Sequence, residues 1–379
     1  PSVDAVSGIE IEDHGPFFRK VDWSAFWTAT VVAFVVYFYT LCPTVGLEDS
    51  GELAVAGDWL GVPHPPGYPI WTMLAWAFTK VFAFVTFRGQ PNPAWSIGLL
   101  SAVFGAFTSG IAAMLICSSG SHILRQSQMI SHNMEERAED IICWVGGVAS
   151  SLLFAFTPIM WSQAVIVEVY SLNAFFLVLI LLFIYMWTRR PSNKLLLLAS
   201  FLFGLGLTNY QVILLAGLAL AICIMLKDFQ LFRDFLFAAA PYALFFVLMK
   251  IPLVENATGG GRHPLLPPVV HPTHITAAVY MILNGAWLTL VYFFFPRGRT
   301  VAPSVLLAQL GIAFYAYMPI VSDLRNPPMN WGYPRTWEGF KHAITRGQYE
   351  KIIPAHIFSM RFVSQMGTYV ADLTLNYRL

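Results

Sequence analysis

The sequence predicts an all-α integral membrane protein, and three observations predict this class. First, 57% of the 379 residues are hydrophobic and 11% are charged, which leaves too few polar residues to cover a soluble globule of this size. Second, apolar runs of roughly 20 residues, enough for a helix to cross about 30 Å of hydrocarbon, recur between Ser24 and Ile320. Third, these runs lack the alternation of apolar and polar residues that is typical of the strands of a membrane β-barrel. The backbone hydrogen bonds of the runs must therefore form within helices.

The polar segment 1–22 is expected to be a cytoplasmic tail. It lacks the basic start, short apolar core and small-residue cleavage site of a signal peptide. Because the sequence begins at Pro1 and not at Met, we expect a trimmed or partial chain.

Nine transmembrane spans are predicted within a membrane domain that covers 23–320. The predicted spans are 24–42, 97–117, 141–156, 171–187, 195–207, 211–225, 235–248, 275–295 and 301–320. Short basic loops that contain Arg189, Lys227 and Arg297 follow the fourth, sixth and eighth spans. The positive-inside rule places these three loops in the cytoplasm.

A tenth apolar run, 69–87, is predicted to be a juxtamembrane or re-entrant helix. A full crossing here would move the three basic loops outside if Arg19 and Lys20 are inside, which contradicts the positive-inside rule. A helix that starts and ends on the outer side is tolerated where protein buries it. The first outer loop then extends over 43–95, and the C-terminal segment 321–379 lies on the outer side.

The first outer loop concentrates carboxylates beside the membrane, because Glu48, Asp49, Glu52 and Asp58 lie close together in the sequence. Asp49 is well placed as the N-cap of a short helix, with Glu52 closing a capping box and Gly61 ending the helix. A carboxylate fixed at a helix start near the interface also suits a general base. The two roles are compatible, and the residues alone leave both open.

The sequence His64-Pro65-Pro66-Gly67 follows this helix. Its prolines stiffen the chain and bias His64 toward an extended conformation. The motif is compatible with a simple turn into the 69–87 helix and with a histidine that contacts a substrate. The interpretation as a substrate contact is favoured because the motif lies close to the acidic residues in the sequence.

Four motifs in this order resemble those of a known family. They are Asp49-Ser50-Gly51-Glu52, His64-Pro65-Pro66-Gly67, Trp161-Ser162 followed by Glu168-Val169-Tyr170-Ser171, and Asn326-Pro327-Pro328-Met329-Asn330-Trp331-Gly332. With the hydropathy profile, they make the chain resemble the GT-C membrane glycosyltransferases. More narrowly, it is similar to a formerly uncharacterised bacterial membrane-domain family that includes an animal transmembrane protein O-mannosyltransferase. Leu47-Glu48 departs from the aromatic pair that often precedes the aspartate there.

The resemblance implies a GT-C-like helix bundle that moves a hexose, expected to be mannose, from a polyprenyl-phosphate carrier to a Ser or Thr hydroxyl. The acceptor would be a secreted or membrane protein on the periplasmic or luminal side. We expect the bacterial inner membrane, or the endoplasmic reticulum membrane in a eukaryote. Family members carry a longer C-terminal region, so 321–379 is expected to be its start. Nucleic acid is excluded as a partner because the basic residues are scattered singly through the loops.

The expected chemistry needs a base more than an acid. A lipid-phosphate leaving group is already a good anion, whereas a Ser or Thr hydroxyl must lose a proton. We therefore expect Asp49 as the general base, Glu52 as its helper or as an acceptor from a sugar hydroxyl, and His64 in contact with phosphate or sugar. No metal ligands are assigned, although two acids three residues apart could bind a divalent cation.

Further substrate-binding residues are expected at the outer ends of the spans. Glu168 and Tyr170 could line the site, or Glu168 could be a solvated acid among interfacial aromatics. Asn209 could contact the sugar or belong to a polar turn. The loop 251–273 is expected to close over donor or acceptor, with metal binding by its histidines a minor alternative.

The fourth motif directly follows Arg325, the residue that we expect to bind the phosphate. Arg325 is the outer cation chosen to neutralise the lipid phosphate, with Arg335 second, because a guanidinium matches phosphate oxygens in a forked geometry. The alternative is an interfacial arginine that contacts lipid headgroups. Asn326, Asn330 and Trp331 are expected to contact the substrate.

Two other functions remain open from the sequence. A lipid or solute transporter or flippase also needs many spans, but its charges are expected near the bilayer midplane and not in one outer loop. A scaffold with an inactive site would function normally without Asp49 and Glu52.

Overall fold

A computed structural model describes residues 16–126, 135–248, 274–349 and 355–377 of the chain. The α-helices are α1 Lys20–Tyr39, α2 Ser50–Trp59, α3 Pro69–Val81, α4 Pro93–Gln126, α6 Glu136–Ala155, α7 Pro158–Ala164, α8 Tyr170–Arg189, α9 Asn193–Leu207, α10 Leu214–Lys227, α11 Phe229–Leu248, α13 His274–Phe294, α14 Gly298–Ile312, α15 Tyr317–Leu324, α16 Trp337–Ile344 and α17 Met360–Tyr377. Two 3₁₀ turns are η1 Gln211–Ile213 and η2 Ala313–Ala316. The strands β1 Thr86–Phe87 and β2 Gln90–Pro91 form a short antiparallel hairpin in which Thr86 pairs with Pro91.

The prediction of an all-α membrane protein is confirmed. Five helical segments of the described chain are long and apolar enough to cross a membrane, namely α1, α4, α6, α8 and the stretch Gly298–Leu324. Three shorter apolar helices accompany them. Each of the nine predicted spans falls on a helix or on consecutive helical segments. The helix α4 is longer than its predicted span because it continues into a serine-rich end, where Ser119 Oγ donates to the Leu115 carbonyl at 2.7 Å.

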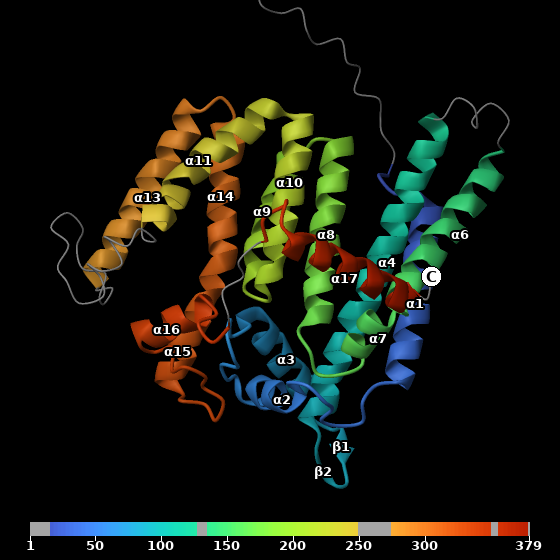
Figure 1. Cartoon of the computed structure of the whole chain (residues 1–379), viewed down its shortest axis with the longest axis horizontal. Coiled ribbons are helices and arrows are strands. Elements are labelled where there is room, and N and C mark those ends of the chain that lie inside the picture. Colours follow the sequence, from blue (N-terminus) through green and yellow to red (C-terminus); the bar gives the residue numbers. More distant parts are fainter. Residues whose placement is uncertain (1–15, 127–134, 249–273, 350–354, 378–379) are drawn as a thin grey trace, which may run out of the picture.

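The long helices stand side by side, whereas α2, α3, the hairpin, α15 and α16 gather at one end of the bundle (Figure 1). The helix α4 packs against α1, α6 and α8, and α9 packs against α14. Small residues permit the closest of these approaches. A Cβ on Gly204 of α9 would meet the Ala308 carbonyl oxygen of α14 at 2.0 Å, which is the close packing typical of membrane helices.

The apolar run 69–87 contains a helix that is too short to cross a bilayer. With 13 residues, α3 is about 20 Å long at 1.5 Å per residue, against about 30 Å of hydrocarbon. Its helix ends at Val81, earlier than the run does, because the chain turns through Val85 into β1. Figure 1 places α3 beside α2 at one end of the bundle. The side of the membrane on which this end lies stays a prediction.

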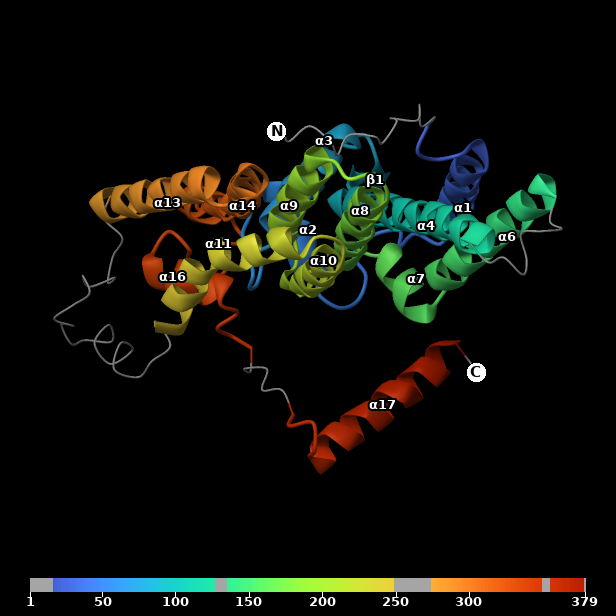
Figure 2. The ribbon, with the colours of Figure 1, turned by 90° about the horizontal axis from the view of Figure 1, so that it is seen from above.

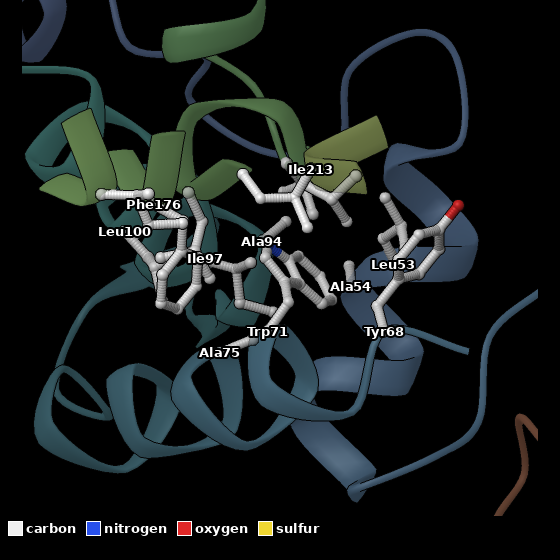
Figure 3. Close-up of a cluster of buried hydrophobic side chains, with 14 of the residues drawn as sticks. Leu53, Ala54, Tyr68, Trp71, Ala75, Ala94, Ile97, Leu100, Phe176 and Ile213 are labelled. Atoms are coloured by element: carbon white, nitrogen blue, oxygen red, sulfur yellow. The ribbon is translucent and has the colours of Figure 1, made fainter. Parts of the chain in front are cut away.

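A buried hydrophobic cluster supports the first loop from the bundle side. Figure 3 shows Trp71 of α3 among Ile97 and Leu100 of α4 and Ile213 of η1. Trp71 is fully buried, and its indole N–H donates to the Glu168 carbonyl at 3.1 Å. Tyr68, at the rim of the cluster, directs its hydroxyl away from it (Figure 3). The cluster therefore fixes α3 and its preceding residues onto the ends of the membrane helices.

The segment 321–379 contains α16 and α17. In Figure 2, α17 lies apart from the bundle. It exposes large apolar side chains, including Met360 and Val363.

Candidate active site

Asp49 begins α2, as the sequence predicts, but the capping-box interpretation is wrong. Asp49 occupies the N-cap position, and its side chain makes no capping hydrogen bond. The carboxylate of Glu52 does not return to the N-cap either, because it is engaged by His64. The carboxylate of Asp49 is 60% exposed and therefore accessible to a substrate.

The end of α2 also differs from the prediction by a small shift. The helix ends at Trp59, and Leu60 adopts a left-handed conformation with φ 50° before Gly61. Gly61 N–H then donates to the Ala56 carbonyl at 2.8 Å. A side chain at Gly61 would meet the Met329 carbonyl oxygen at 2.6 Å, so this glycine permits the close approach of a distant segment.

His64 is buried and hydrogen-bonded on both sides of its ring. Its backbone N–H donates to Glu52 Oε1 at 2.6 Å, and its Nδ1 lies 3.2 Å from the same oxygen. On the other side, the Tyr68 hydroxyl lies 2.7 Å from Nε2. Because a carboxylate only accepts, Nδ1 carries the proton toward Glu52, and Tyr68 donates to Nε2 while the imidazole is neutral. Glu52 and Tyr68 thus fix the orientation of the ring.

Asp49 completes a cluster with these two residues. Its Oδ2 lies 3.7 Å from His64 Nε2, and the ligand atoms of Asp49, Glu52 and His64 all lie within 4.8 Å of one another. Two carboxylates suit a hard divalent cation such as Mg²⁺ or Mn²⁺. His64 would have to give up its hydrogen bond to Glu52 or to Tyr68 to join as a ligand.

The charge state of His64 depends on its acidic neighbours. Burial lowers the pKa of the imidazole, but the hydrogen bond to Glu52 and its charge raise it. The charges of Asp49 and Glu168 add smaller increases, and the net result is a pKa above the ordinary 6.5. The raised pKa favours the cationic form of the imidazole more than in a free histidine, and a cationic ring favours contact with an anion.

Glu168 lies against the same cluster in the connection between α7 and α8. Glu168 is only 4% exposed. The alternative prediction from the sequence, a solvated acid among interfacial aromatic residues, is therefore wrong. Burial raises the pKa of its carboxyl to about 7, with the backbone N–H of Val169 acting in the opposite direction. Trp71 and Ser101 both donate to its carbonyl oxygen at 3.1 Å.

Four tyrosines are linked to His64 by ring contacts, directly or through one another, and the sequence did not single out Tyr68 or Tyr349. Tyr68 stacks on Tyr210 with ring centroids 6.3 Å apart, and Tyr170 meets Tyr210 edge to face at 5.3 Å. The ring of Tyr349 lies 6.5 Å from the His64 ring. Tyr170 was expected here, and Tyr68 directly follows the His-Pro-Pro-Gly motif, a position that could have identified it. Aromatic faces of this kind suit the apolar faces of a sugar.

Arg346 is the cation that the structure brings to these tyrosines, and sequence reasoning missed it. Its guanidinium lies 4.4 Å from the Tyr349 ring centroid and 5.6 Å from that of Tyr210. It follows α16, and Gln211 ties this region to the bundle by donating to the Ile344 carbonyl at 2.7 Å. Its only signal in the sequence is a basic residue in the segment predicted to lie on the outer side.

Asn209 lies deep beside Glu168. It is fully buried, and its amide donates to the Val169 carbonyl at 3.3 Å. Its Oδ1 has no hydrogen-bond partner within the described residues. Asn209 thus lies in a turn between α9 and η1, as the polar-turn alternative predicts, and its role as a sugar contact stays a prediction.

The fourth motif pairs with Val62, two residues before the His-Pro-Pro-Gly sequence. Val62 donates to the Met329 carbonyl and Trp331 donates to the Val62 carbonyl, both at 2.8 Å, which forms a parallel bridge between Val62 and Asn330. The Asn326 side chain accepts from Asn330 at 3.2 Å. The motif is thus joined to the first loop, and the role of its residues as substrate contacts stays a prediction.

Arg325 and Arg335 lie at this segment without contacting the cluster. Arg325 caps the end of α15 and is exposed. Across the described part of the chain, no hydrogen bond or ion pair joins it to Asp49, Glu52 or His64. Arg335 binds Asn326 Oδ1 at 3.4 Å and stacks over Tyr333. The expected loop 251–273, with Arg262, His263 and His271, lies outside the described residues.

Comparison with known proteins identifies the same region of the chain. Residues 49–233 match the family model described as the N-terminal domain of protein O-mannosyl-transferase TMEM260. Protein O-mannosyl-transferase tmem260 of Dictyostelium discoideum is 26% identical over 254 residues, 59% of this chain and 27% of that protein. Protein O-mannosyl-transferase TMEM260 of Mus musculus is 29% identical over 185 residues, 48% of this chain and 22% of that protein. The chain thus covers about a quarter of the length of these relatives. No solved structure matches it.

Proposed function

We propose, from the match of residues 49–233 to the N-terminal domain of protein O-mannosyl-transferase TMEM260, that the chain transfers mannose from a polyprenyl-phosphate carrier to a Ser or Thr hydroxyl. The acceptor is a secreted or membrane protein, and the reaction takes place on the outer side of the bacterial inner membrane, or in the endoplasmic reticulum of a eukaryote. One observation carries the proposal, namely that Asp49, Glu52 and His64 meet within 4.8 Å at one end of a membrane bundle.

Asp49 is the general base of this proposal. Glu52 is unsuited to the role because its Oε1 already accepts the backbone N–H of His64 and faces Nδ1. The carboxylate of Asp49 is 60% exposed, so an acceptor hydroxyl has access to it. Glu52 acts instead on His64, whose ring it orients and whose pKa it raises.

The proposed transfer is a single displacement at the anomeric carbon of the sugar. The acceptor oxygen forms a bond to this carbon while the bond from carbon to phosphate oxygen breaks. The hydroxyl proton passes to Asp49, and the electron pair of the broken bond leaves with the polyprenyl phosphate. Since this leaving group is an anion, the site must stabilise negative charge more than it must supply a proton.

His64 and Arg346 are the proposed cations for the phosphate. The pKa of His64 is raised, and Arg346 lies 4.4 Å from the ring of Tyr349, which in turn lies 6.5 Å from the His64 ring. A guanidinium can bind two phosphate oxygens at once. We propose Arg346 for the role that the sequence assigned to Arg325, because Arg346 contacts the tyrosines around His64. Tyr170, Tyr210 and Tyr349 are then placed to contact the sugar.

The test is transfer by the purified full chain in detergent or nanodiscs. The donor is polyprenyl-phosphate-mannose, the acceptor is a peptide that contains Ser and Thr, and mass spectrometry measures the product. We expect Asp49→Asn to lower kcat by about 100- to 10,000-fold, the usual contribution of a general base. The matched control is Asp58→Asn, because Asp58 lies on the same helix but pairs with Lys80 at 3.1 Å.

Two results would contradict the proposal. If the Asp49→Asn variant retained full transfer, Asp49 would not be the general base. If mannose were transferred from a nucleotide-linked donor but not from the lipid-linked donor, polyprenyl phosphate would not be the carrier. Uptake of a solute or flipping of a lipid by the reconstituted chain, without any mannosylated product, would favour a transporter instead.

The chelator EDTA tests a divalent cation at the same cluster. We expect transfer to continue in its presence, because Glu52 and Tyr68 already hold both nitrogens of His64. Loss of transfer that Mn²⁺ or Mg²⁺ restores would instead assign Asp49 and Glu52 to a cation.

A further inference from the structure

A polar cavity lies at the opposite end of the bundle from α2 and α3. It has a volume of about 210 Å³, and its lining residues come mainly from the start of α1 and from the ends of α4 and α8. Figure 1 shows these helix ends opposite α2 and α3. Four arginines and a histidine line it together with one carboxylate; they are Arg19, Arg125, Arg189, Arg190, His122 and Asp22. Two serines, one tyrosine and one phenylalanine complete the lining; they are Ser118, Ser121, Tyr185 and Phe17. This concentration of positive charge has no role in the proposed transfer.

Carboxylates hold two of these arginines at one side of the cavity. Arg19 Nη2 lies 3.0 Å from Asp22, and its Nη1 lies 2.8 Å from Asp140 and 3.2 Å from Glu139. Arg125 Nε lies 2.9 Å from Glu139. These acidic residues belong to α1 and α6, so their negative charge is concentrated away from α8.

The side formed by α8 differs, because Arg189 faces an imidazole and not a carboxylate. Its Nη1 contacts Nε2 of His122 on α4, which accepts the hydrogen bond as a neutral ring. Within the described part of the chain, no ion pair to a carboxylate involves Arg189. The guanidinium is thus held at the cavity by a group that leaves its positive charge uncompensated.

The lining matches the chemistry of a phosphate ester. Arginine presents forked donors that fit phosphate oxygens, and hydroxyls supply further donors. A volume of 210 Å³ is below the roughly 300–1,000 Å³ of sites for larger ligands, so a headgroup phosphate fits better than a nucleotide. Basic pockets between the ends of membrane helices are typical binding sites of anionic lipid headgroups.

We propose that this cavity binds the phosphate of an anionic lipid headgroup, at the membrane face opposite the candidate active site. The ligand bridges Arg189 of α8 to Arg19, at the N-cap of α1, and to Arg125 of α4. It would therefore tie together the ends of three helices that frame the N-terminal half of the bundle. The inference is independent of the proposed sugar transfer.

The test measures lipid binding to the delipidated full chain by native mass spectrometry. Phosphatidylglycerol is the anionic probe and phosphatidylcholine, which carries a phosphate but no net charge, is the comparison. We expect phosphatidylglycerol to bind at least tenfold more tightly than phosphatidylcholine. We expect Arg189→Gln to lower the affinity for phosphatidylglycerol at least tenfold. The matched control is Lys194→Gln, which removes a positive charge from the exposed start of α9 outside the cavity and should change affinity less than twofold.

A second variant and a soluble ligand complete the test. Arg189→Lys keeps the charge and the fold but loses the forked donors, so we expect binding weaker than that of the unsubstituted chain. Inorganic phosphate at millimolar concentration should compete with phosphatidylglycerol. Equal binding of the two lipids, or unchanged affinity in both Arg189 variants, would overturn the proposal. Tight binding of inorganic phosphate without preference for the anionic lipid would assign the cavity to a soluble phosphate and would overturn the lipid assignment.

Discussion

The charge state of Glu168 depends on its burial in the fold. Its carboxyl is buried beside His64, and burial raises its pKa to about 7 from an ordinary 4.5. The sequence predicted its place near the site from the third motif, but not its burial, because burial depends on how α3 and α4 pack around it. Trp71 and Ser101 come from these two helices and hold its backbone carbonyl.

The raised pKa predicts a dependence of stability on pH. A carboxyl with a pKa raised in the folded state stabilises the fold fully below pH 4.5, and this contribution is lost as the pH rises toward about 7. Above pH 7 the folded protein must hold a buried charge, at a cost on the order of 3 kcal/mol. We therefore expect Glu168→Gln to raise Tm relative to the unsubstituted chain at pH 8 but not at pH 4.5.

Thermal unfolding in detergent, followed by tryptophan fluorescence, measures this difference. The raised pKa of His64 gives a pH dependence of the same sign, and both chains contain this histidine, so the two chains are compared at each pH. A Tm difference that is the same at pH 4.5 and pH 8 would contradict the assigned pKa.

The crossing of α9 and α14 shows how the elements depend on small residues. Gly204 and Gly311 face the partner backbone so closely that a Cβ would lie 2.0 Å and 2.4 Å from its nearest atoms. The apolar runs predicted both helices, since hydropathy is a local property. Their contact could not be predicted, because the runs do not specify which helices pack together.

A valine at Gly204 is predicted to separate these helices. The new side chain would meet backbone atoms that cannot rotate away, and overpacking of this kind costs about 1–3 kcal/mol or more. We expect Gly204→Val to lower Tm by several degrees, measured by thermal unfolding. Gly146→Val on α6 is the control, because a Cβ there meets nothing within 4 Å, and an equal loss of stability in both variants would contradict the packing argument.

At the scale of the whole molecule, the chain joins its first loop to α15 and to the segment that follows it. Val62 pairs with Asn330, and the Tyr317 hydroxyl donates to the Gly61 carbonyl at 3.0 Å. The candidate active site therefore combines α2, the His-Pro-Pro-Gly segment and the residues after α15. The basic loops lie at the opposite end of the bundle (Figure 1).

This arrangement predicts which positions are accessible from each side of the membrane. In a chain without native cysteines, Leu47→Cys, at an 84% exposed position, should react with a membrane-impermeant maleimide in intact cells. Lys194→Cys should react only after permeabilisation, since it lies at the start of α9, shortly after the basic residues Arg189 and Arg190. Gel-shift labelling measures both, and reaction of the two positions from the same side would contradict their location at opposite ends of the bundle.

The sequence by itself determined the class of the protein, its helices and the residues of its acidic loop. These properties follow from local quantities: the length of apolar runs, the placement of basic loops and the spacing of Asp49, Glu52 and His64. The order of four motifs also indicated the family that residues 49–233 match.

Only the tertiary structure decided how these residues are used. It engaged Glu52 with His64 and not with the N-cap, left Asp49 exposed, and brought Arg346 to the tyrosines around His64 in place of Arg325. It also buried Glu168 and gathered four arginines into a cavity at the other end of the bundle. The physical reason is the same in each case. Burial and contacts between residues far apart in the chain depend on which helices pack together, and no local pattern encodes that choice.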